Sequence, residues 1–61
     1  MIYELNNVYY MKINNLYYVA EITIKKHTIV VSPTEEYVTK LEGATEYTYQ
    51  ELKRKLIPRA L

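Results

Sequence analysis

The chain has 61 residues, no cysteine, one histidine and a net charge of +1. A domain of this length buries only about 60% of the surface that its unfolded chain exposes, so it is marginally stable without a further device. The composition excludes disulfides and thiolate metal sites, and His27 with glutamates alone matches no usual zinc-ligand spacing. We therefore expect no metal and no cofactor, and we expect self-association, with a homodimer preferred.

The sequence also restricts the compartment. No apolar run approaches the ~20 residues that a membrane span needs, and the start MIYELNNVYY lacks the charged region and apolar core of a signal peptide. The absence of cysteine fits a reducing compartment. Ile, Lys, Asn and Tyr, which have A/T-rich codons, are used heavily. We expect a cytoplasmic protein without membrane partners, encoded by a phage or another mobile element and acting in the host cytoplasm.

Residues 8–31 consist of short runs of Tyr, Val and Ile between polar pairs, a pattern typical of β-strands. A two-residue turn at Asn14-Asn15 pairs Ile13 with Leu16, and a turn at 26–27 pairs Ile24 with Ile29. Because side chains alternate along a strand, three antiparallel strands share one apolar face. That predicted core face carries Tyr9, Met11, Ile13, Leu16, Tyr18, Ala20, Ile22, Ile24, Ile29 and Val31.

The pair Asn6-Asn7 has two interpretations. If it turns, Leu5 pairs with Val8, and Tyr3 pairs with Tyr10 on the outer face. If the strand continues through it, Tyr3 and Leu5 lie on the core face instead. We favour a straight or bulged continuation, which makes the two Asn pairs structurally different although both stand in an Asn-Asn-aliphatic-Tyr-Tyr context.

Helix signals begin at the segment SPTEEYVTKLEG. Ser32 suits an N-cap, Pro33 the first helical position, and Glu35 the third position of a capping box. Gly43 suits a C-cap. We predict a helix over 33–42, in which one stripe faces the sheet and consists of Tyr37, Val38 and Leu41.

A second capping box, formed by Thr48 and Glu51, predicts a helix over 48–57. The connecting residues 44–47 form either a loop or a short strand. The elements together predict one domain over 1–61 in the α+β class. It has an antiparallel meander of three to four strands, centred on residues 1–32, followed by two short helices that cover one face.

Catalytic constellations are missing from the sequence. His27 falls in a predicted turn without an orienting carboxylate, and Ser32 has no hydrolase context. The glutamates occupy capping or i, i+4 positions, and a single glycine provides no phosphate-binding loop. We expect a protein that is not an enzyme.

The outer face of the predicted sheet is unusually apolar for a solvated surface. Tyrosine is favoured in strands and also at the centres of protein interfaces, so the face is either a tolerant strand surface or a binding surface. We favour binding, by another protein whose activity is modulated or inhibited or by a second copy of the chain. The predicted contact residues are Val8, Tyr10, Lys12, Tyr17, Val19 and Val30.

Nucleic acid is the alternative partner, because exposed aromatic side chains on a sheet can stack with bases. The chain lacks the strong basic excess of such proteins, however. Positive charge gathers only at the end of the sequence, after an acidic middle of five glutamates and one lysine over 32–51. This basic end either is solvated or contacts an anionic partner through Lys53, Arg54, Lys55 and Arg59.

Overall fold

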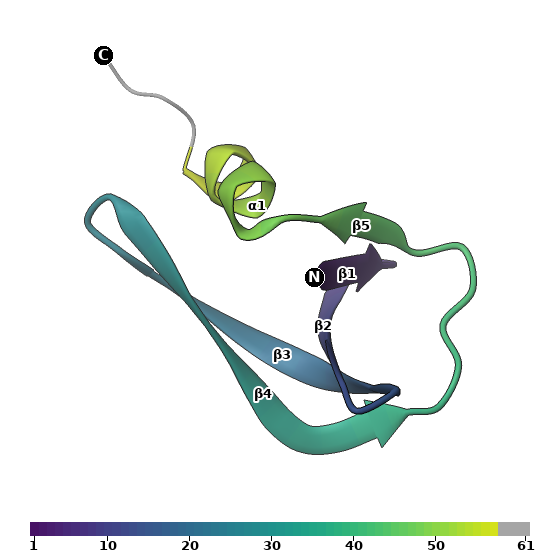
Figure 1. The fold of residues 1–61 in the computed structure, drawn as a ribbon. Coiled ribbons are helices and arrows are strands. Elements are labelled where there is room, and N and C mark those ends of the chain that lie inside the picture. The colour runs from purple at the N-terminus through teal and green to yellow at the C-terminus, as the bar shows by residue number, and fades with distance from the viewer. Residues whose placement is uncertain (58–61) are drawn as a thin grey trace.

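The computed structural model describes residues 1–57 as a curled antiparallel sheet of five strands with one short helix (Figure 1). The strands lie side by side in the order β4-β3-β2-β1-β5. The protein is thus predominantly β, in rough agreement with the predicted α+β class. The elements are β1 (Ile2–Leu5), β2 (Val8–Ile13), β3 (Leu16–Lys25), β4 (Thr28–Val38), β5 (Thr45–Tyr47) and α1 (Tyr49–Leu56).

The predicted register of the two central hairpins is confirmed. Ile13 pairs with Leu16 across the turn between β2 and β3, and Ile24 pairs with Ile29 across the turn between β3 and β4. Asn14 and Asn15 have φ values of 51° and 68°. These are the left-handed values that a two-residue primed turn requires and that Asn tolerates.

The prediction of a strand running through Asn6-Asn7 is wrong. Both residues have positive φ, 52° and 68°, nearly the same values as Asn14 and Asn15. The chain therefore reverses there, and Leu5 pairs with Val8 while Tyr3 pairs with Tyr10. The backbone N–H of Asn7 donates to Oε2 of Glu4 at 2.8 Å, which stabilises the turn. The two Asn pairs are structurally equivalent hairpin turns.

The predicted helix over 33–42 is also wrong, because β4 continues to Val38. Val38 pairs with Tyr17 and Tyr37 pairs with Tyr18, so Tyr37 and Val38 are strand residues. Ser32, proposed as an N-cap, instead pairs with Glu21 inside the sheet. The local capping signals are overridden by pairing with β3, to which Val, Thr and Tyr are well suited.

The helix signals of that segment coincide with a bulge in β4. The register shifts between the pairs Tyr18–Tyr37 and Ala20–Pro33, so β4 holds extra residues there. The Thr34 hydroxyl donates to the carbonyl oxygen of Val19 at 2.8 Å and restores a hydrogen bond that the bulge removes. Bulges bend a strand and increase its twist, and β4 bends sharply along its length (Figure 1).

The connection from β4 to β5 replaces the predicted end of that helix. Gly43 has a φ of +80°, a conformation that favours glycine, but it lies in this connection and caps no helix. Of the two interpretations of residues 44–47, the strand is correct. β5 pairs with β1, with Ile2 opposite Tyr47 and Tyr3 opposite Glu46.

The second predicted helix is confirmed as α1. Thr48 is its N-cap, and Oγ1 of Thr48 accepts from the N–H of Glu51 at 3.1 Å. In return, the N–H of Thr48 donates to Oε1 of Glu51 at 2.9 Å. This reciprocal capping box satisfies backbone donors that the first turn leaves free.

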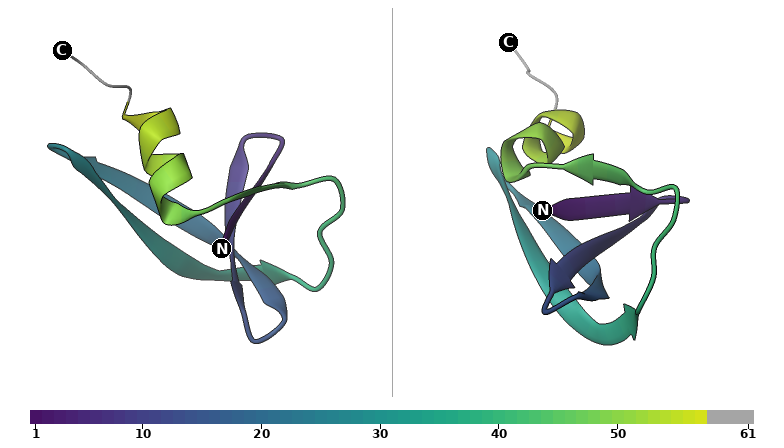
Figure 2. Two further views of the ribbon diagram at one scale, coloured as in Figure 1. Left: turned by 45° about the horizontal axis from the view of Figure 1, so that its top comes forward. Right: turned by 45° about the vertical axis from the view of Figure 1, so that its right-hand side comes forward.

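The core lies between α1 and the inner face of the curled sheet (Figure 2). Its buried side chains are Ile2, Ile29 and Leu52, and only the last has no exposed surface. Tyr9, Ile22, Val31, Tyr47, Leu56 and Ile57 pack around them. Two predicted core residues are exposed, Ile13 by 37% and Ile24 by 55%. Both lie at strand ends, and a helix of eight residues is only about 12 Å long, too short to cover the whole face.

Candidate protein-interaction surface

The side of the sheet opposite to α1 carries a row of aromatic residues across neighbouring strands. Tyr10 is paired with Tyr3 on one side and with Val19 on the other. In the next row, Tyr17 is paired with Lys12 and with Val38. Paired residues share a face, and residues two apart on one strand do as well. We call this surface the outer tyrosine face, consisting of Tyr3, Tyr10, Lys12, Tyr17, Val19 and Val38.

The structure brings together four of the six predicted contact residues, Tyr10, Lys12, Tyr17 and Val19. Val8 borders the same face, opposite Leu5. Val30 is separate, because it pairs with Thr23, four residues beyond Val19 on β3 and about 13 Å away along the strand. Val30 therefore belongs to the distant end of the β3–β4 hairpin.

Two members of the outer tyrosine face were missed in the sequence. Tyr3 was assigned to the core side, because Asn6-Asn7 was interpreted as a continuing strand. Val38 was assigned to a helix. The signal that locates Tyr3 is the repetition of Asn-Asn-aliphatic-Tyr-Tyr. The second copy was correctly interpreted as a turn followed by a strand, and the same interpretation of the first copy pairs Tyr3 with Tyr10.

Aromatic contacts fix the geometry of the face. The rings of Tyr3 and Tyr17 meet edge to face, with centroids 5.3 Å apart and planes at 89°. Nζ of Lys12 lies 5.6 Å from the centroid of Tyr17. Edge-to-face pairs and cation–π contacts each stabilise by roughly 0.5–1.5 kcal/mol. Rings held in this way present a partner with a surface that loses little conformational freedom on binding.

Carboxylates outnumber cations around the outer tyrosine face. Lys12 lies on the face, Glu46 borders it opposite Tyr3, and Glu21 borders it two residues beyond Val19, where Glu35 and Glu36 are also close. Burial raises the pKa of the Tyr3 hydroxyl above its ordinary value, and the neighbouring Glu46 carboxylate raises it further. Tyr3 therefore remains a neutral hydroxyl at physiological pH, and the surface has an aromatic centre with an acidic border.

α1 does not cover the outer tyrosine face, since it packs on the other side of the sheet against Ile2 and Ile29. Val8 and Val38 are each 38% exposed, and the tyrosines are half-buried. Contiguous apolar surface of this kind on a small protein is a feature of partner-binding sites.

The basic end of the sequence, expected to act as one unit, is divided in the structure. Nζ of Lys55 donates to the Tyr47 hydroxyl at 3.0 Å and lies 4.9 Å from the centre of that ring. This hydrogen bond is the main reason that the pKa of Lys55 is raised. Lys53 and Arg54 line a pocket elsewhere on α1, and Arg59 lies outside the described residues.

Within residues 1–57, no group of three or more His, Asp or Glu side chains is arranged to hold a metal ion. The same part of the chain contains no helix that is long and apolar enough to cross a membrane. A comparison with known proteins finds no matching family model, no matching curated protein and no matching solved structure.

Proposed function

We propose that this protein is a non-enzymatic protein–protein interaction module that binds through the outer tyrosine face. The observation that supports the proposal is the row Tyr3, Tyr10 and Val19 with its neighbour Tyr17, an aromatic surface on the side of the sheet away from α1. Tyrosine is enriched at the energetic centres of interfaces because a rigid ring buries much surface and its hydroxyl still finds hydrogen bonds.

A second copy of the chain is the first occupant that we propose. The described core buries three hydrophobic side chains, of which only Leu52 is buried completely, and the chain has no disulfide. Small domains of this kind gain stability when they associate. A twofold dimer places the same patch on both partners, and the aromatic centre of the face can meet its own copy while the carboxylates at its border, such as Glu21 and Glu46, stay in water.

The further role that we propose is modulation or inhibition of a host protein in the host cytoplasm by a protein encoded by a phage or mobile element. A target protein would bind the same face, in place of the second copy or beside it. Nucleic acid is the less favoured partner, because single-stranded nucleic acid is bound in strongly basic grooves, whereas Lys12 on this face is outnumbered by Glu46 and Glu21 at its border.

The test is affinity capture from a host lysate with and without nuclease, using the wild-type chain and the double variant Tyr10→Thr/Tyr17→Thr. Threonine keeps the strand preference and removes the rings. We expect the wild type to retain a protein after nuclease treatment and the double variant to lose it. The matched control is Tyr37→Thr, because Tyr37 is 52% exposed but pairs with Tyr18 on the opposite face.

Two outcomes contradict the proposal. Loss of all captured material on nuclease treatment would assign the chain to nucleic-acid binding. Equal capture by the wild type and by Tyr10→Thr/Tyr17→Thr would show that the outer tyrosine face is only a strand-forming surface.

A further inference from the structure

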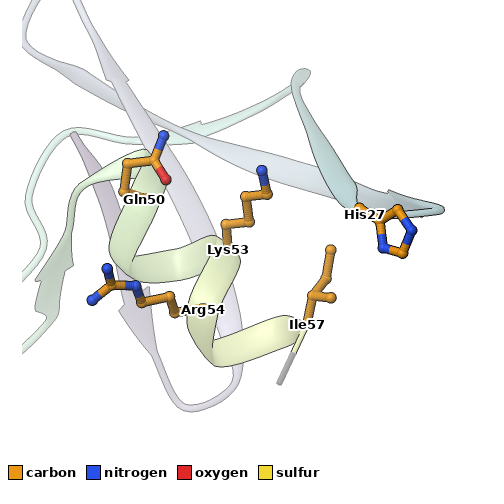
Figure 3. Close-up of a pocket in the computed structure, with 5 residues that line it drawn as sticks. All are labelled: His27, Gln50, Lys53, Arg54 and Ile57. Atoms are coloured by element: carbon orange, nitrogen blue, oxygen red, sulfur yellow. The ribbon is translucent and has the colours of Figure 1, made fainter. Parts of the chain in front are cut away.

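A pocket of about 400 Å³ lies between α1 and the turn that joins β3 to β4 (Figure 3). Its lining residues are His27 from the turn and Gln50, Lys53, Arg54 and Ile57 from the helix and its C-terminus. This volume is at the small end of the range of about 300–1,000 Å³ that is usual for ligand pockets. The pocket is separate from the outer tyrosine face.

The helical repeat explains why these residues gather. Gln50, Lys53, Arg54 and Ile57 follow an i, i+3, i+4, i+7 spacing, which places them along one side of the helix. Lys53 lies nearest to the core stripe of Leu52 and Leu56, and it is only half-exposed. Figure 3 shows Lys53 and Ile57 projecting from the helix toward the hairpin, with His27 beyond Ile57.

The pocket combines positive charge with an apolar floor. No carboxylate lines it, and within residues 1–57 neither Lys53 nor Arg54 has a salt-bridge partner. Ile57 and the methylene stems of the long side chains supply the apolar surface. In Figure 3 the Arg54 guanidinium points away from His27, whereas the Lys53 side chain extends toward the hairpin, so Lys53 is the cation on the pocket side of the helix.

We propose that this pocket binds a small organic carboxylate whose apolar body rests on Ile57 and whose anionic group pairs with Lys53. A charged group bound by one ammonium suits a monoanion better than a phosphate dianion, which usually recruits several donors or an arginine fork. The apolar floor requires a hydrophobic body, and the cavity volume limits it to about the size of one or two aromatic rings.

The first test is a titration of the full chain followed by amide NMR shifts, with 2-naphthoate, its neutral amide 2-naphthamide, and inorganic phosphate as probes. We expect shifts at residues 27 and 50–57 with naphthoate, and binding of naphthamide weaker by about tenfold or more, since a charge-assisted hydrogen bond is lost. Phosphate should bind more weakly than naphthoate. Equal affinity for naphthoate and naphthamide, or for naphthoate and phosphate, would overturn the proposal.

Substitutions of the basic residues identify which charge binds the carboxylate. Lys53→Gln should weaken naphthoate binding by about tenfold, and Arg54→Gln should weaken it less. Lys40→Gln is the matched control, because Lys40 is exposed in the β4–β5 connection and lies outside the pocket. If Lys53→Gln binds naphthoate as the wild type does, the proposal is wrong.

A second pair of variants keeps the test valid if Lys53→Gln fails to fold. Gln50 is exposed on the rim of the pocket. Gln50→Glu should repel naphthoate and weaken its binding severalfold, whereas Gln50→Lys should strengthen it. The same affinity in both Gln50 variants would overturn the assignment of an anion to this pocket.

Discussion

The two faces of the curled sheet are built from the same strands and contain similar side chains, yet they differ in what covers them. The inner face presents Tyr9, Ile22 and Val31 to α1, and Ile2 and Ile29 are enclosed with Leu52 in this region. The outer face presents Tyr3, Tyr10 and Tyr17, and α1 packs on the side away from it. Composition alone does not distinguish the face that forms the core from the opposite face. The position of α1 does.

Covered and exposed side chains also occur side by side within the inner face. Ile29 is 2% exposed and its strand partner Ile24 is 55% exposed, although the two side chains share one face. The difference is that the Tyr49 hydroxyl donates to the carbonyl oxygen of Ile29, which ties the start of α1 to β4. A covered and an uncovered residue of the inner face can therefore be direct partners on neighbouring strands.

Leu52→Ala should reduce the stability of the protein most, because it removes the fully buried side chain that α1 contributes to the inner face. We expect a loss of about 2–5 kcal/mol in the free energy of unfolding, measured by urea denaturation. Such a loss is large for a small domain. Ile24→Ala is the matched control and should cost at most about 0.5 kcal/mol. Equal costs would mean that the covered and uncovered ends of the inner face do not differ.

The Asn turns set the register and therefore decide which side chains lie on which face. Asn7→Ala and Asn15→Ala should each destabilise by about 1–2 kcal/mol, because alanine resists the positive φ of 68° that both positions have. Asn7→Gly and Asn15→Gly should be neutral or stabilising. Thermal denaturation of the four variants tests the equivalence of the two turns, and a cost at only one of the two positions would refute it.

Thr48→Ala should destabilise α1, which covers the inner face, while leaving the core side chains unchanged. It removes the oxygen that accepts from the N–H of Glu51, and we expect a loss of about 1 kcal/mol. Hydrogen exchange should accelerate in α1 and leave the β2–β3 pairing protected. Unchanged exchange in α1 would show that packing of Leu52, and not the capping box, holds the helix in place.

The smallest expected effect concerns the outer face at alkaline pH. The raised pKa of Tyr3 means that the unfolded chain loses this proton first, near pH 10, while the folded chain retains it. Stability contributed by the neutral hydroxyl is therefore complete below about pH 10 and decreases as pH rises toward the folded pKa.

Tyr3→Phe should consequently lose less stability between pH 9 and pH 11 than the wild type, in urea denaturation at each pH. The raised pKa of Lys55 acts in the same direction in both proteins, so their difference isolates Tyr3. Tyr37→Phe controls for an exposed tyrosine of the opposite face. Parallel pH curves for the wild type and Tyr3→Phe would contradict the assigned environment of Tyr3.

The hairpin at Asn14-Asn15 was predictable because a turn signal agrees with an alternating apolar pattern on both sides. A capping box predicted both helices, the one over 48–57 and the one over 33–42, and only the former exists. Ser32, Pro33 and Glu35 gave a local helix signal, but the partner that overrides it, β3, lies more than ten residues away in sequence. Local helix propensity contains no information about that long-range strand pairing.

The candidate site was predictable to the same extent. Tyr10, Lys12, Tyr17 and Val19 lie on correctly assigned strands, and they do form one surface. Tyr3 was missed because Asn6-Asn7 was predicted to continue a strand, and Val38 was missed because its segment was predicted to be a helix. The pocket beside His27 was not predicted, because it requires the tip of one hairpin to meet a helix more than 20 residues later in the chain.

Sedimentation at several protein concentrations tests most directly whether the outer tyrosine face is a binding surface or a solvated strand surface without a partner. We predict that the wild type and Tyr37→Thr associate as concentration rises, and that Tyr10→Thr/Tyr17→Thr stays at the mass of one folded chain. Each buried aromatic anchor can contribute ~2 kcal/mol or more, so the shift in association should be at least tenfold. A wild type that remains a monomer throughout, or a double variant that associates equally well, would contradict the account.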